Sequence, residues 1–448
     1  MTDTDVQRAD AVYEKLLARA GEAWVEPRLE RTARLLTYLD DPQRTYRVVH
    51  VTGTNGKTST ARIIESLIRA HGLRTGLFTS PHLVRFTERI LIDGEPIADD
   101  AVADAWDDIE SFVPLVDAEL EADGQNPLTF FELLTVLAFV ACADAPVDVL
   151  VLEVGMGGAW DATNTADGDV AVIAPIDIDH ADRLGNTREE IAEVKAGIIK
   201  PGADVVSARQ DPSVAAVLRR VAAEKGATIA FEGDEFALTD DALAVGGQLV
   251  TIRGLAGEYD EEYLPLYGRH QGANAALALA AVEALIGGGE QKIAADVRTQ
   301  GFAEVASPGR LQLVGTEPTV IVDAAHNPHG ARALVSALQE AFDFEEWGVV
   351  LGVMADKDIP GLIEALSPVT THLFATQSGS DRSASADEVA DAAEELGMRP
   401  TVHADIADAT DAAREWAASG EKRGVVVAGS IVLGGEAIAL ARVDGWKS

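Results

Sequence analysis

The segment from Val48 to Thr60 constrains the fold of this chain more than any other stretch. Three valines among residues 48–51 lead into a turn bracketed by Gly53 and Gly56, and an apolar-periodic stretch follows from Ala61. This order predicts a buried strand, a loop and a helix, which is the context that a phosphate-binding loop requires. The loop has the short Gly-x-x-Gly-Lys-Thr form, because Val51 occupies the position of the first glycine in the longer consensus.

Each residue type in this loop suits a polyphosphate. The two glycines let the backbone approach the ligand closely, and the helix N-terminus presents unpaired N–H groups. Lys57 adds a mobile positive charge, and Thr58 or Ser59 offers a hydroxyl to Mg²⁺. We predict nucleotide binding rather than a solvated turn, because chance matches to the motif rarely follow a buried strand.

Size and charge limit the classes of partner. A chain of 448 residues exceeds one hydrophobic core, so we expect two or three domains. Its 74 acidic residues against 36 basic ones argue against nucleic acid or an anionic membrane as a partner. The acidic residues are spread along the whole chain, which predicts a soluble protein adapted to high salt. We therefore expect small-molecule partners, and a monomer.

The cysteine count and the N-terminus predict a cellular compartment. A single cysteine, Cys142, excludes a disulfide framework and favours a reducing interior. No stretch reaches the length that spans a membrane, and the acidic N-terminus lacks the pattern of a signal peptide. These features predict a cytoplasmic protein.

Lysine is used sparingly, with nine lysines against 27 arginines. Four of the nine lie in motifs: Lys57, Lys195 and Lys200 in those described in this subsection, and Lys357 in Asp356-Lys357-Asp358. Arginine supplies surface charge equally well, but it does not supply a compact or modifiable amine. The retained lysines therefore indicate a chemical role that needs an amine, rather than surface charge alone.

The first three hundred residues alternate between helical and strand patterns. We expect helices over 5–20 and 27–39, a strand breaking at Pro81, a hairpin over 89–97, two helices of which the second starts near Thr129, and a buried strand from Val147 to Val154. Alternation continues to about residue 231, followed by a β-rich patch over 236–266 and a helix over 270–286. This pattern predicts a mostly parallel sheet with helices on both faces.

A second α/β pattern begins after Ser307-Pro308-Gly309-Arg310. Strands are expected at 320–323, 348–354, 371–376 and 424–430, and a helix opens at Asn327. We predict an α/β fold with domains over 1–304 and 305–448, the second smaller and Rossmann-like, with the site in the cleft between them.

Seven motifs occur together in this order: His50 to Lys57, Thr79 to His82, Glu153 to Gly158, Asp161 to Asn164, Asp179-His180, Lys195 to Lys200, and Asp323 to Pro328. In joint order and spacing the chain resembles the folylpolyglutamate synthase and dihydrofolate synthase family, within the Mur ligase superfamily, from about Leu29 to Gly434. The resemblance implies a P-loop central domain of the Mur ligase type. It also implies an ATP-dependent ligase that adds L-glutamate to dihydropteroate or to folyl-polyglutamate through an acyl phosphate, releasing ADP and phosphate. A Mur-type ligase for a different carboxylated substrate, or a nucleotide-binding regulatory module without ligase activity, stays open as an alternative.

The resemblance also implies roles for residues. The catalytic residues would be Lys57, Lys195, His180 and His326. The ATP contacts would be Thr54, Asn55, Gly56, Lys57, Thr58, Ser59, Asn274, Arg310, Asp323 and His326. The acceptor would lie against Leu29, Glu30, Arg31, Pro81, His82, Thr129, Phe130, Phe131 and Asp161. One Mg²⁺ ion would take Ser80, Glu153 and His180 as ligands, and a second ion beside the phosphates would take Thr58 or Ser59. A monovalent cation such as K⁺ is a further expectation.

Several of these residues also have ordinary interpretations. Ser80 alone could cap a turn, His180 could be a satisfied loop histidine, and Lys195 could be a solvated helix residue rather than the carbamylated lysine that the family suggests. Glu153 differs, because a carboxylate that ends an apolar strand is costly to bury without a cation. Of the adjacent Phe130 and Phe131, at least one should pack inward on a helix.

Departures from the pattern affect the acceptor end. Ala159 and Thr87 stand where the family commonly has arginine and asparagine, so the accepted pteroate or folate form stays open. Gly155 to Gly158 does not form a dinucleotide-binding fingerprint, because Trp160 occupies the place of the third glycine.

Overall fold

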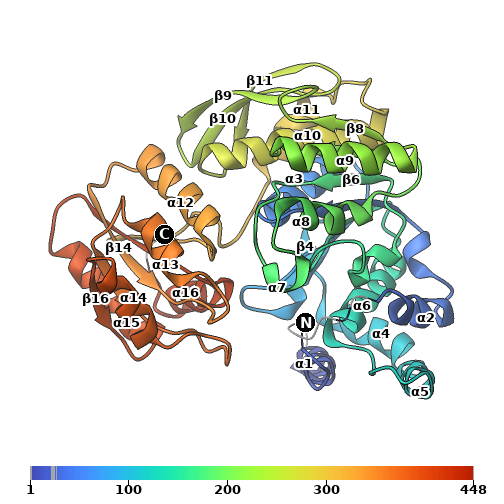
Figure 1. The fold of residues 1–448 in the computed structure, drawn as a ribbon, viewed down its shortest axis with the longest axis horizontal. Coiled ribbons are helices and arrows are strands. Elements are labelled where there is room, and N and C mark those ends of the chain that lie inside the picture. The colour runs from blue at the N-terminus through green and yellow to red at the C-terminus, as the bar shows by residue number, and fades with distance from the viewer. Residues whose placement is uncertain (1–2, 22–25, 27, 447–448) are drawn as a thin grey trace.

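In this computed structural model, residues 3–21, 26 and 28–446 are described. They form two α/β units of unequal size, each built around its own sheet, and the segment near residue 305 joins them (Figure 1). Among them, no helix is both long and apolar enough to cross a membrane.

An eight-stranded sheet organises the first part of the chain. Its order is β4-β3-β2-β5-β1-β6-β7-β8, and all pairs are parallel except β2–β3 and β3–β4. The strands are β1 (Arg47–Thr52), β2 (Thr75–Phe78), β3 (Ile90–Ile92), β4 (Glu95–Pro96), β5 (Val149–Glu153), β6 (Val170–Ile173), β7 (Asp204–Ser207) and β8 (Thr228–Phe231). Parallel order puts the carboxyl ends of β1, β2, β5 and β6 at one edge, where an open sheet binds its ligands.

Helices cover both faces of this sheet because its strands are apolar on both sides. Val49 and Val51 of β1 face the buried helices α3 (Lys57–Ala70) and α10 (Arg269–Gly287). Val48 faces the opposite layer, which contains α1 (Asp3–Leu17), α2 (Glu30–Tyr38), α4 (Asp99–Glu110), α5 (Val113–Ala122) and α6 (Phe130–Asp144). The helices α8 (Arg188–Lys195) and α9 (Pro212–Lys225) pack over β6, β7 and β8, and the short α7 (Ala181–Leu184) precedes them.

A small antiparallel sheet lies outside α10. It consists of β9 (Ala237–Ala244), β10 (Gly247–Arg253) and β11 (Glu258–Leu264), and α11 (Ala295–Ala303) packs beside it. Val250 and Ile252 of β10 join α10 in one continuous core. This packing explains why α10 is buried nearly all round, as its alanine-rich sequence allows.

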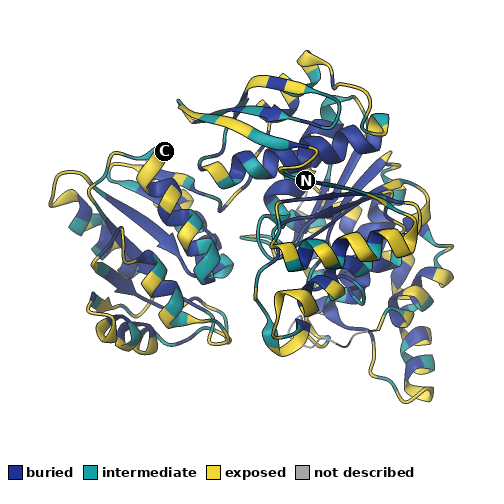
Figure 2. Cartoon of the chain, turned by 45° about the horizontal axis from the view of Figure 1, so that its top comes forward, coloured by how far each residue is buried: buried dark blue, intermediate teal, exposed yellow. Residues whose placement is uncertain are grey.

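A six-stranded sheet organises the second part, in the order β12-β13-β17-β14-β15-β16. Its strands are β12 (Gln312–Thr316), β13 (Thr319–Val322), β14 (Glu346–Leu351), β15 (His372–Ala375), β16 (Arg399–Val402) and β17 (Arg423–Ala428). One face packs on α12 (Pro328–Ala341), α13 (Ile359–Leu366) and α14 (Ala386–Glu395), and the other on α15 (Ile406–Ala418) and α16 (Ile431–Val443). Figure 2 shows buried strands in both sheets and exposed residues on the outer faces of the helices.

The α/β fold class with two mostly parallel sheets is confirmed, and three details of the sequence prediction were wrong. Three helices rather than two separate the hairpin from β5, because Pro114 in the first turn of α5 starts a new helix directly after α4. Both edge strands, β12 and β16, were missed, since β12 is only partly buried and the Arg-Pro-Thr-Val sequence of β16 is largely exposed and lacks an apolar alternation. The first two helices end earlier than expected, at Leu17 and Tyr38.

Candidate active site

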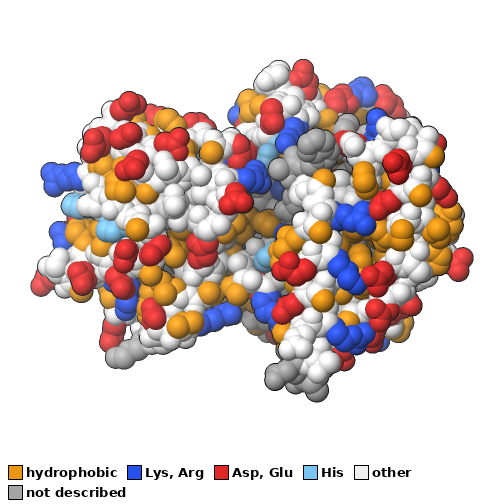
Figure 3. Space-filling view, turned by 90° about the horizontal axis from the view of Figure 1, so that it is seen from below, with side chains coloured by type: hydrophobic (Ala, Val, Ile, Leu, Met, Phe, Trp, Pro, Cys, Tyr) orange, Lys and Arg blue, Asp and Glu red, His pale blue; other side chains and the backbone are white. Residues whose placement is uncertain are grey.

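A cavity of about 1170 Å³ lies at the carboxyl ends of the first sheet and is closed on one side by the second domain. Figure 3 shows the furrow between the two lobes, with acidic side chains scattered over both. The P-loop occupies the middle of the cavity, because β1 is a central strand.

The strand order divides the cavity into two arms. Residues after β5 and β2, such as Asp161 and His82, line one arm. Residues after β6, β7 and β8, together with the first turns of α10, line the other: Pro175, Ala208, Glu232, Gln271 and Asn274. A ligand bound at the P-loop can therefore extend in two directions along the edge of the sheet.

Both P-loop glycines are required by the backbone. Gly53 has φ 152°, and a Cβ there would lie 2.6 Å from the Ala174 Cβ. Gly56 caps α3 in the left-handed region at φ 84°, where a Cβ would lie 2.7 Å from the Asn274 Oδ1. The close approach of Gly56 places Asn274 directly against the loop.

Lys57 folds back over its own loop. Its Nζ donates to the Gly53 and Thr54 carbonyl oxygens, each at 3.2 Å. Burial lowers the pKa of Lys57, and the carboxylates of Glu153 and Asp179 oppose that shift. The ammonium is therefore held where the phosphates of a nucleotide would lie.

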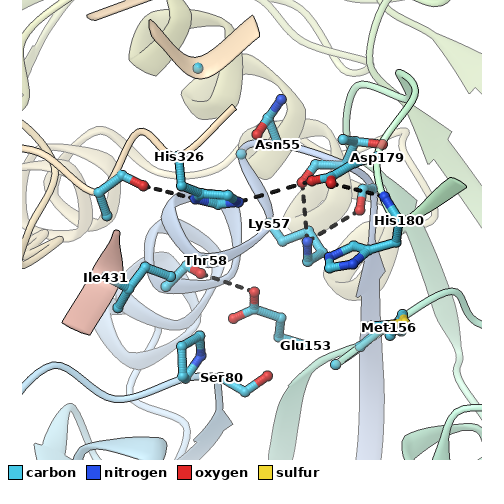
Figure 4. A pocket seen from close by; sticks show the side chains of 18 of the residues that line it. Asn55, Lys57, Thr58, Ser80, Glu153, Met156, Asp179, His180, His326 and Ile431 are labelled. Carbon is cyan, nitrogen blue, oxygen red and sulfur yellow. Dashed lines mark hydrogen bonds and ion pairs between the residues drawn. The ribbon is translucent and has the colours of Figure 1, made fainter. Parts of the chain in front are cut away.

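Glu153 forms the floor of the site at the end of β5. It is 1% exposed, its Oε1 accepts a hydrogen bond of 2.9 Å from the Thr58 hydroxyl, and its buried Oε2 has no partner (Figure 4). Burial raises the pKa of Glu153, while the charge of Lys57 and the hydrogen bond from Thr58 act in the opposite direction. A buried carboxylate oxygen without a partner needs a cation.

These groups suit Mg²⁺, which prefers oxygen ligands. Among the described residues there is no cluster of three His, Cys, Asp or Glu that could hold a metal. The hydroxyls of Thr58 and Ser80 fill that gap, because both line the same cavity as Glu153 (Figure 4). His180 lines it too, on the loop after β6.

Asp179 connects the two domains, and sequence reasoning did not select it as a site residue. Its Oδ1 accepts from the Lys357 Nζ at 2.9 Å, its Oδ2 accepts from the Asn327 side chain at 3.3 Å, and the His326 Nε2 lies 4.0 Å away. Although burial opposes it, the charge and the hydrogen bond of Lys357 hold the pKa of Asp179 well below its usual range. The sequence signals were the Asp179-His180 motif and the retained Lys357, and neither shows that the two residues pair.

Two of the histidines that line the cavity, His326 and His180, have pKa values below the usual imidazole range. Burial lowers the pKa of His326 to about 4, with Lys357 adding to the shift, and its Nδ1 lies 2.9 Å from the Ala324 carbonyl oxygen. Burial also lowers the pKa of His180, against the attraction of Asp179. Both imidazoles can therefore accept a proton or a cation on one nitrogen.

Lys195 lies beneath the P-loop and is 3% exposed. Its Nζ donates to the Gly53 carbonyl oxygen at 2.7 Å. Burial lowers its pKa to about 7, and the charge of Lys57 contributes. The ordinary interpretation of a solvated helix residue is wrong, since this amine faces the cavity and is partly neutral at pH 7.

On the nucleoside side, the predicted residues come together at the cavity. Asn274 is 6% exposed and donates to Gln271 at 3.1 Å. Arg310 lines the cavity at the junction of the domains. Asp323 accepts from the backbone N–H groups of Leu311 and Ala325 at 2.9 and 2.8 Å. Thr54, Asn55, Ser59 and His326 line the same cavity.

The other arm combines aromatic and polar groups. Phe131 packs against Gly155, where a Cβ would lie 2.5 Å from the ring. Asp161 is 4% exposed, and its carboxylate accepts from the Met156 and Thr163 backbone N–H groups at 2.9 and 3.0 Å. Pro81, His82 and Thr129 also line this arm.

Four residues expected against the acceptor do not line the cavity: Leu29, Glu30, Arg31 and Phe130. Arg31 is fully buried and forms an ion pair with Glu26, which does line the cavity together with Arg28. Phe130 is the ring that packs inward, at 4% exposure, as the adjacent pair required. Tyr13 and Trp160 line this arm and were not selected from the sequence.

Comparisons with known proteins agree with this geometry. Residues 51–282 match the Mur ligase middle domain, and residues 309–431 match the Mur ligase glutamate ligase domain. A dihydrofolate synthase/folylpolyglutamate synthase of Mycobacterium tuberculosis is 43% identical over 439 residues, covering 93% of this chain and 90% of that protein. The Escherichia coli enzyme of the same name is 35% identical, covering 82% and 80%.

Solved structures are equally similar. Folylpolyglutamate synthase of M. tuberculosis, complexed with ADP, superimposes with a TM-score of 0.93 at 43% identity, covering 98% of this chain and 99% of that one. E. coli FolC in complex with DHPP and ADP gives a TM-score of 0.84 at 31% identity, covering 97% and 98%.

The P-loop domain, the second α/β domain and the cavity between them define an ATP-dependent ligase of the Mur type. Within this superfamily, the chain belongs to the folylpolyglutamate synthase/dihydrofolate synthase family.

Proposed function

We propose that this enzyme uses ATP to join L-glutamate to the carboxylate of a pteroate or folate, releasing ADP and phosphate. The observation that carries the proposal is the meeting of the two cavity arms at Lys57, Thr58 and Glu153. There, a nucleotide phosphate and an acceptor carboxylate can reach each other.

The chemistry explains why both arms are needed. A carboxylate is a poor electrophile, so one of its oxygens attacks the γ-phosphorus of ATP, and the bond to ADP breaks. The resulting acyl phosphate has a carbonyl that the glutamate amine attacks, and phosphate leaves with the original carboxylate oxygen. The amine loses its proton to a neighbouring base.

The chain's own residues hold the charges of this reaction. Lys57 and the N–H groups at the start of α3 bind the phosphates, and Arg310 adds positive charge from the junction of the domains. This local charge is essential, because a protein of net charge −38 repels all three anionic substrates. His326, neutral and close to Asp179, is placed to accept the proton of the attacking amine.

Mg²⁺ would be held by Thr58, Ser80, Glu153 and His180, and when bound it neutralises phosphate charge. The unpartnered Oε2 of Glu153 is the observation that supports this assignment. A second ion beside the phosphates, and a monovalent cation such as K⁺, stay predictions.

Carbamylation of Lys195 is part of the proposal. Carbamylation requires a neutral amine, and the buried Lys195 with its pKa near 7 provides one. The product would be an anion beneath the P-loop, which could bind a second cation. Mass spectrometry of the intact protein, with and without bicarbonate, tests this modification.

Other features of the protein stay predictions as well. These are the monomeric state, the cytoplasmic location, adaptation to high salt and the domain boundary between residues 304 and 305.

A substrate-omission assay tests the proposed function. Phosphate release should require ATP, L-glutamate and a pteroate or folate acceptor together, and we expect activity in strong KCl with dihydropteroate or tetrahydrofolate. Release that is indifferent to glutamate would favour a regulatory nucleotide-binding module. Release with a UDP-linked peptide, but not with a pteroate, would favour a different Mur-type substrate.

A further inference from the structure

The helix α1 lies outside both matched Mur ligase domains, the first of which begins at residue 51, yet it contributes a residue to the cavity. Tyr13 lines the acceptor arm, together with His82 and Arg89. The helix is amphipathic, and Ala9, Val12 and Leu16 are buried in the core shared with α4 and α6. Tyr13 is half-buried and lies at the border between this core and the cavity.

Neighbouring rings fix the orientation of Tyr13. Its ring stacks on Phe86 with a centroid distance of 4.7 Å and an interplanar angle of 4°. It meets His82 edge-on at 5.9 Å and Phe130 edge-on at 6.2 Å. The Arg89 Nε donates to the His82 Nδ1 at 2.8 Å, and the Arg89 guanidinium lies 5.4 Å from the Phe130 ring centroid. Tyr13 is therefore part of a rigid aromatic cluster rather than a mobile surface ring.

Ion pairs hold the outer side of the same helix. Arg8 pairs with Asp104 and Asp107 of α4 at 3.2 and 3.1 Å, and Lys15 pairs with Glu110 at 2.6 Å. These pairs are exposed, so each contributes little alone, and together they set the position of α1 on α4.

A third attachment fixes the chain just after α1. The Phe130 backbone N–H donates to the Ala20 carbonyl oxygen at 3.0 Å, which joins this segment to the start of α6. Gly21, the next residue, lines the cavity too. The N-terminal segment is thus built into the wall of the acceptor arm.

We infer that Tyr13 is a binding residue for the pterin ring of the acceptor, and that α1 is the element that positions it. The inference rests on the proposed function. A pterin is a flat bicycle that needs apolar contact on its faces and hydrogen bonds at its edges. In this arm Asp161 and Thr129 provide polar groups, whereas Tyr13, Phe131 and Trp160 provide rings.

This role predicts a specific kinetic effect. Removing the ring should weaken binding of the acceptor. It should leave ATP binding unaffected, because Tyr13 lies on the side of the P-loop opposite to Asn274 and Glu232. We expect no effect on glutamate, since the proposed role concerns the pterin ring alone. A ring that served only to pack α1 would change stability without changing the KM for the acceptor alone.

The test compares Tyr13→Phe, Tyr13→Leu and Tyr13→Ala with the parent enzyme in phosphate release. We expect Tyr13→Ala and Tyr13→Leu to raise the KM for dihydropteroate at least tenfold, with the KM values for ATP and glutamate within twofold. Tyr13→Phe keeps the ring and should stay within threefold. Tyr13→Leu keeps apolar bulk against Phe86, so it separates lost binding from lost packing.

Tyr38→Ala is the matched control. Tyr38 also stacks on a phenylalanine of the N-terminal layer, Phe112, at 5.8 Å, but it does not line the cavity. It should leave every KM unchanged. The thermal shift produced by ADP shows whether each variant is folded.

An acceptor KM within twofold of the parent value in folded Tyr13→Ala and Tyr13→Leu would overturn the inference. Failure of the parent enzyme to release phosphate with any pteroate or folate would instead overturn the proposed function. In that case direct binding of dihydropteroate, compared between the parent and Tyr13→Leu, still tests Tyr13, and equal affinity would refute its role.

Discussion

Replacing Glu153 by glutamine should remove activity and at the same time stabilise the metal-free protein. The substitution keeps the side-chain shape, and its carbonyl oxygen can still accept from the Thr58 hydroxyl, now 2.9 Å from the Glu153 Oε1. It removes the charge at the unpartnered Oε2. Loss of this cation ligand should lower kcat by at least a hundredfold, which corresponds to about 3 kcal/mol of transition-state stabilisation.

The stability effect follows from the raised pKa of Glu153. Between the unfolded pKa and the higher folded pKa, the folded protein keeps a proton that the unfolded chain has lost. The free energy of unfolding therefore falls as the pH rises through this window, and it stays lower at pH 7. Glutamine does not titrate, so the variant should lack this pH dependence and should unfold with a higher free energy than the parent at pH 7.

Thermal unfolding with and without Mg·ADP, together with phosphate release, measures both effects. Mg·ADP should stabilise the parent protein more than the variant. Glu65→Gln is the control, because Glu65 is a buried carboxylate of α3 that pairs with Arg69 at 3.0 Å and does not line the cavity. It should keep the Mg²⁺ dependence. An unchanged magnesium titration and normal turnover in Glu153→Gln would refute the reasoning.

Three further predictions concern charge. Lys57→Ala should abolish phosphate release while the circular dichroism spectrum stays unchanged, because this loop lysine binds phosphates rather than packing in the core; normal turnover would contradict its assignment. Lys195→Met should flatten the dependence of stability on pH. Between about pH 7 and the usual lysine pKa, the folded parent binds fewer protons than the unfolded chain, so its free energy of unfolding rises with pH. An identical slope in the variant would contradict this prediction. KCl at molar concentration should raise the unfolding temperature of the parent, because it screens the repulsion within a chain of net charge −38. An unfolding temperature that stays constant from dilute buffer to molar KCl would show that this repulsion does not destabilise the protein.

Local patterns made the centre of the site predictable. The strand, glycine-bracketed loop and helix from Val48 to Ile68 are adjacent in sequence, so one segment contains both the structure and the chemistry. Glu153 was predictable for a similar reason, because a carboxylate at the end of an apolar strand must meet a cation.

The remaining details depend on packing between distant segments. Phe130 and Phe131 are adjacent on α6, and packing against distant residues, Gly155 and Phe78, accompanies the placement of Phe131 at the cavity. Tyr13 reaches the same arm because α1 packs on α4, about ninety residues further along the chain. The pairing of Asp179 with Lys357 crosses two domains, and no local pattern predicts which carboxylate a retained lysine will meet.

The acyl phosphate is the central chemical claim, and an isotope transfer measures it most directly. The acceptor is labelled with ¹⁸O in its carboxylate and turned over with ATP and L-glutamate, and the released phosphate is analysed by mass spectrometry. The account predicts one ¹⁸O atom in each phosphate, because the carboxylate oxygen that attacks the γ-phosphorus leaves with it. Phosphate without the label, formed together with the glutamyl product, would contradict the account.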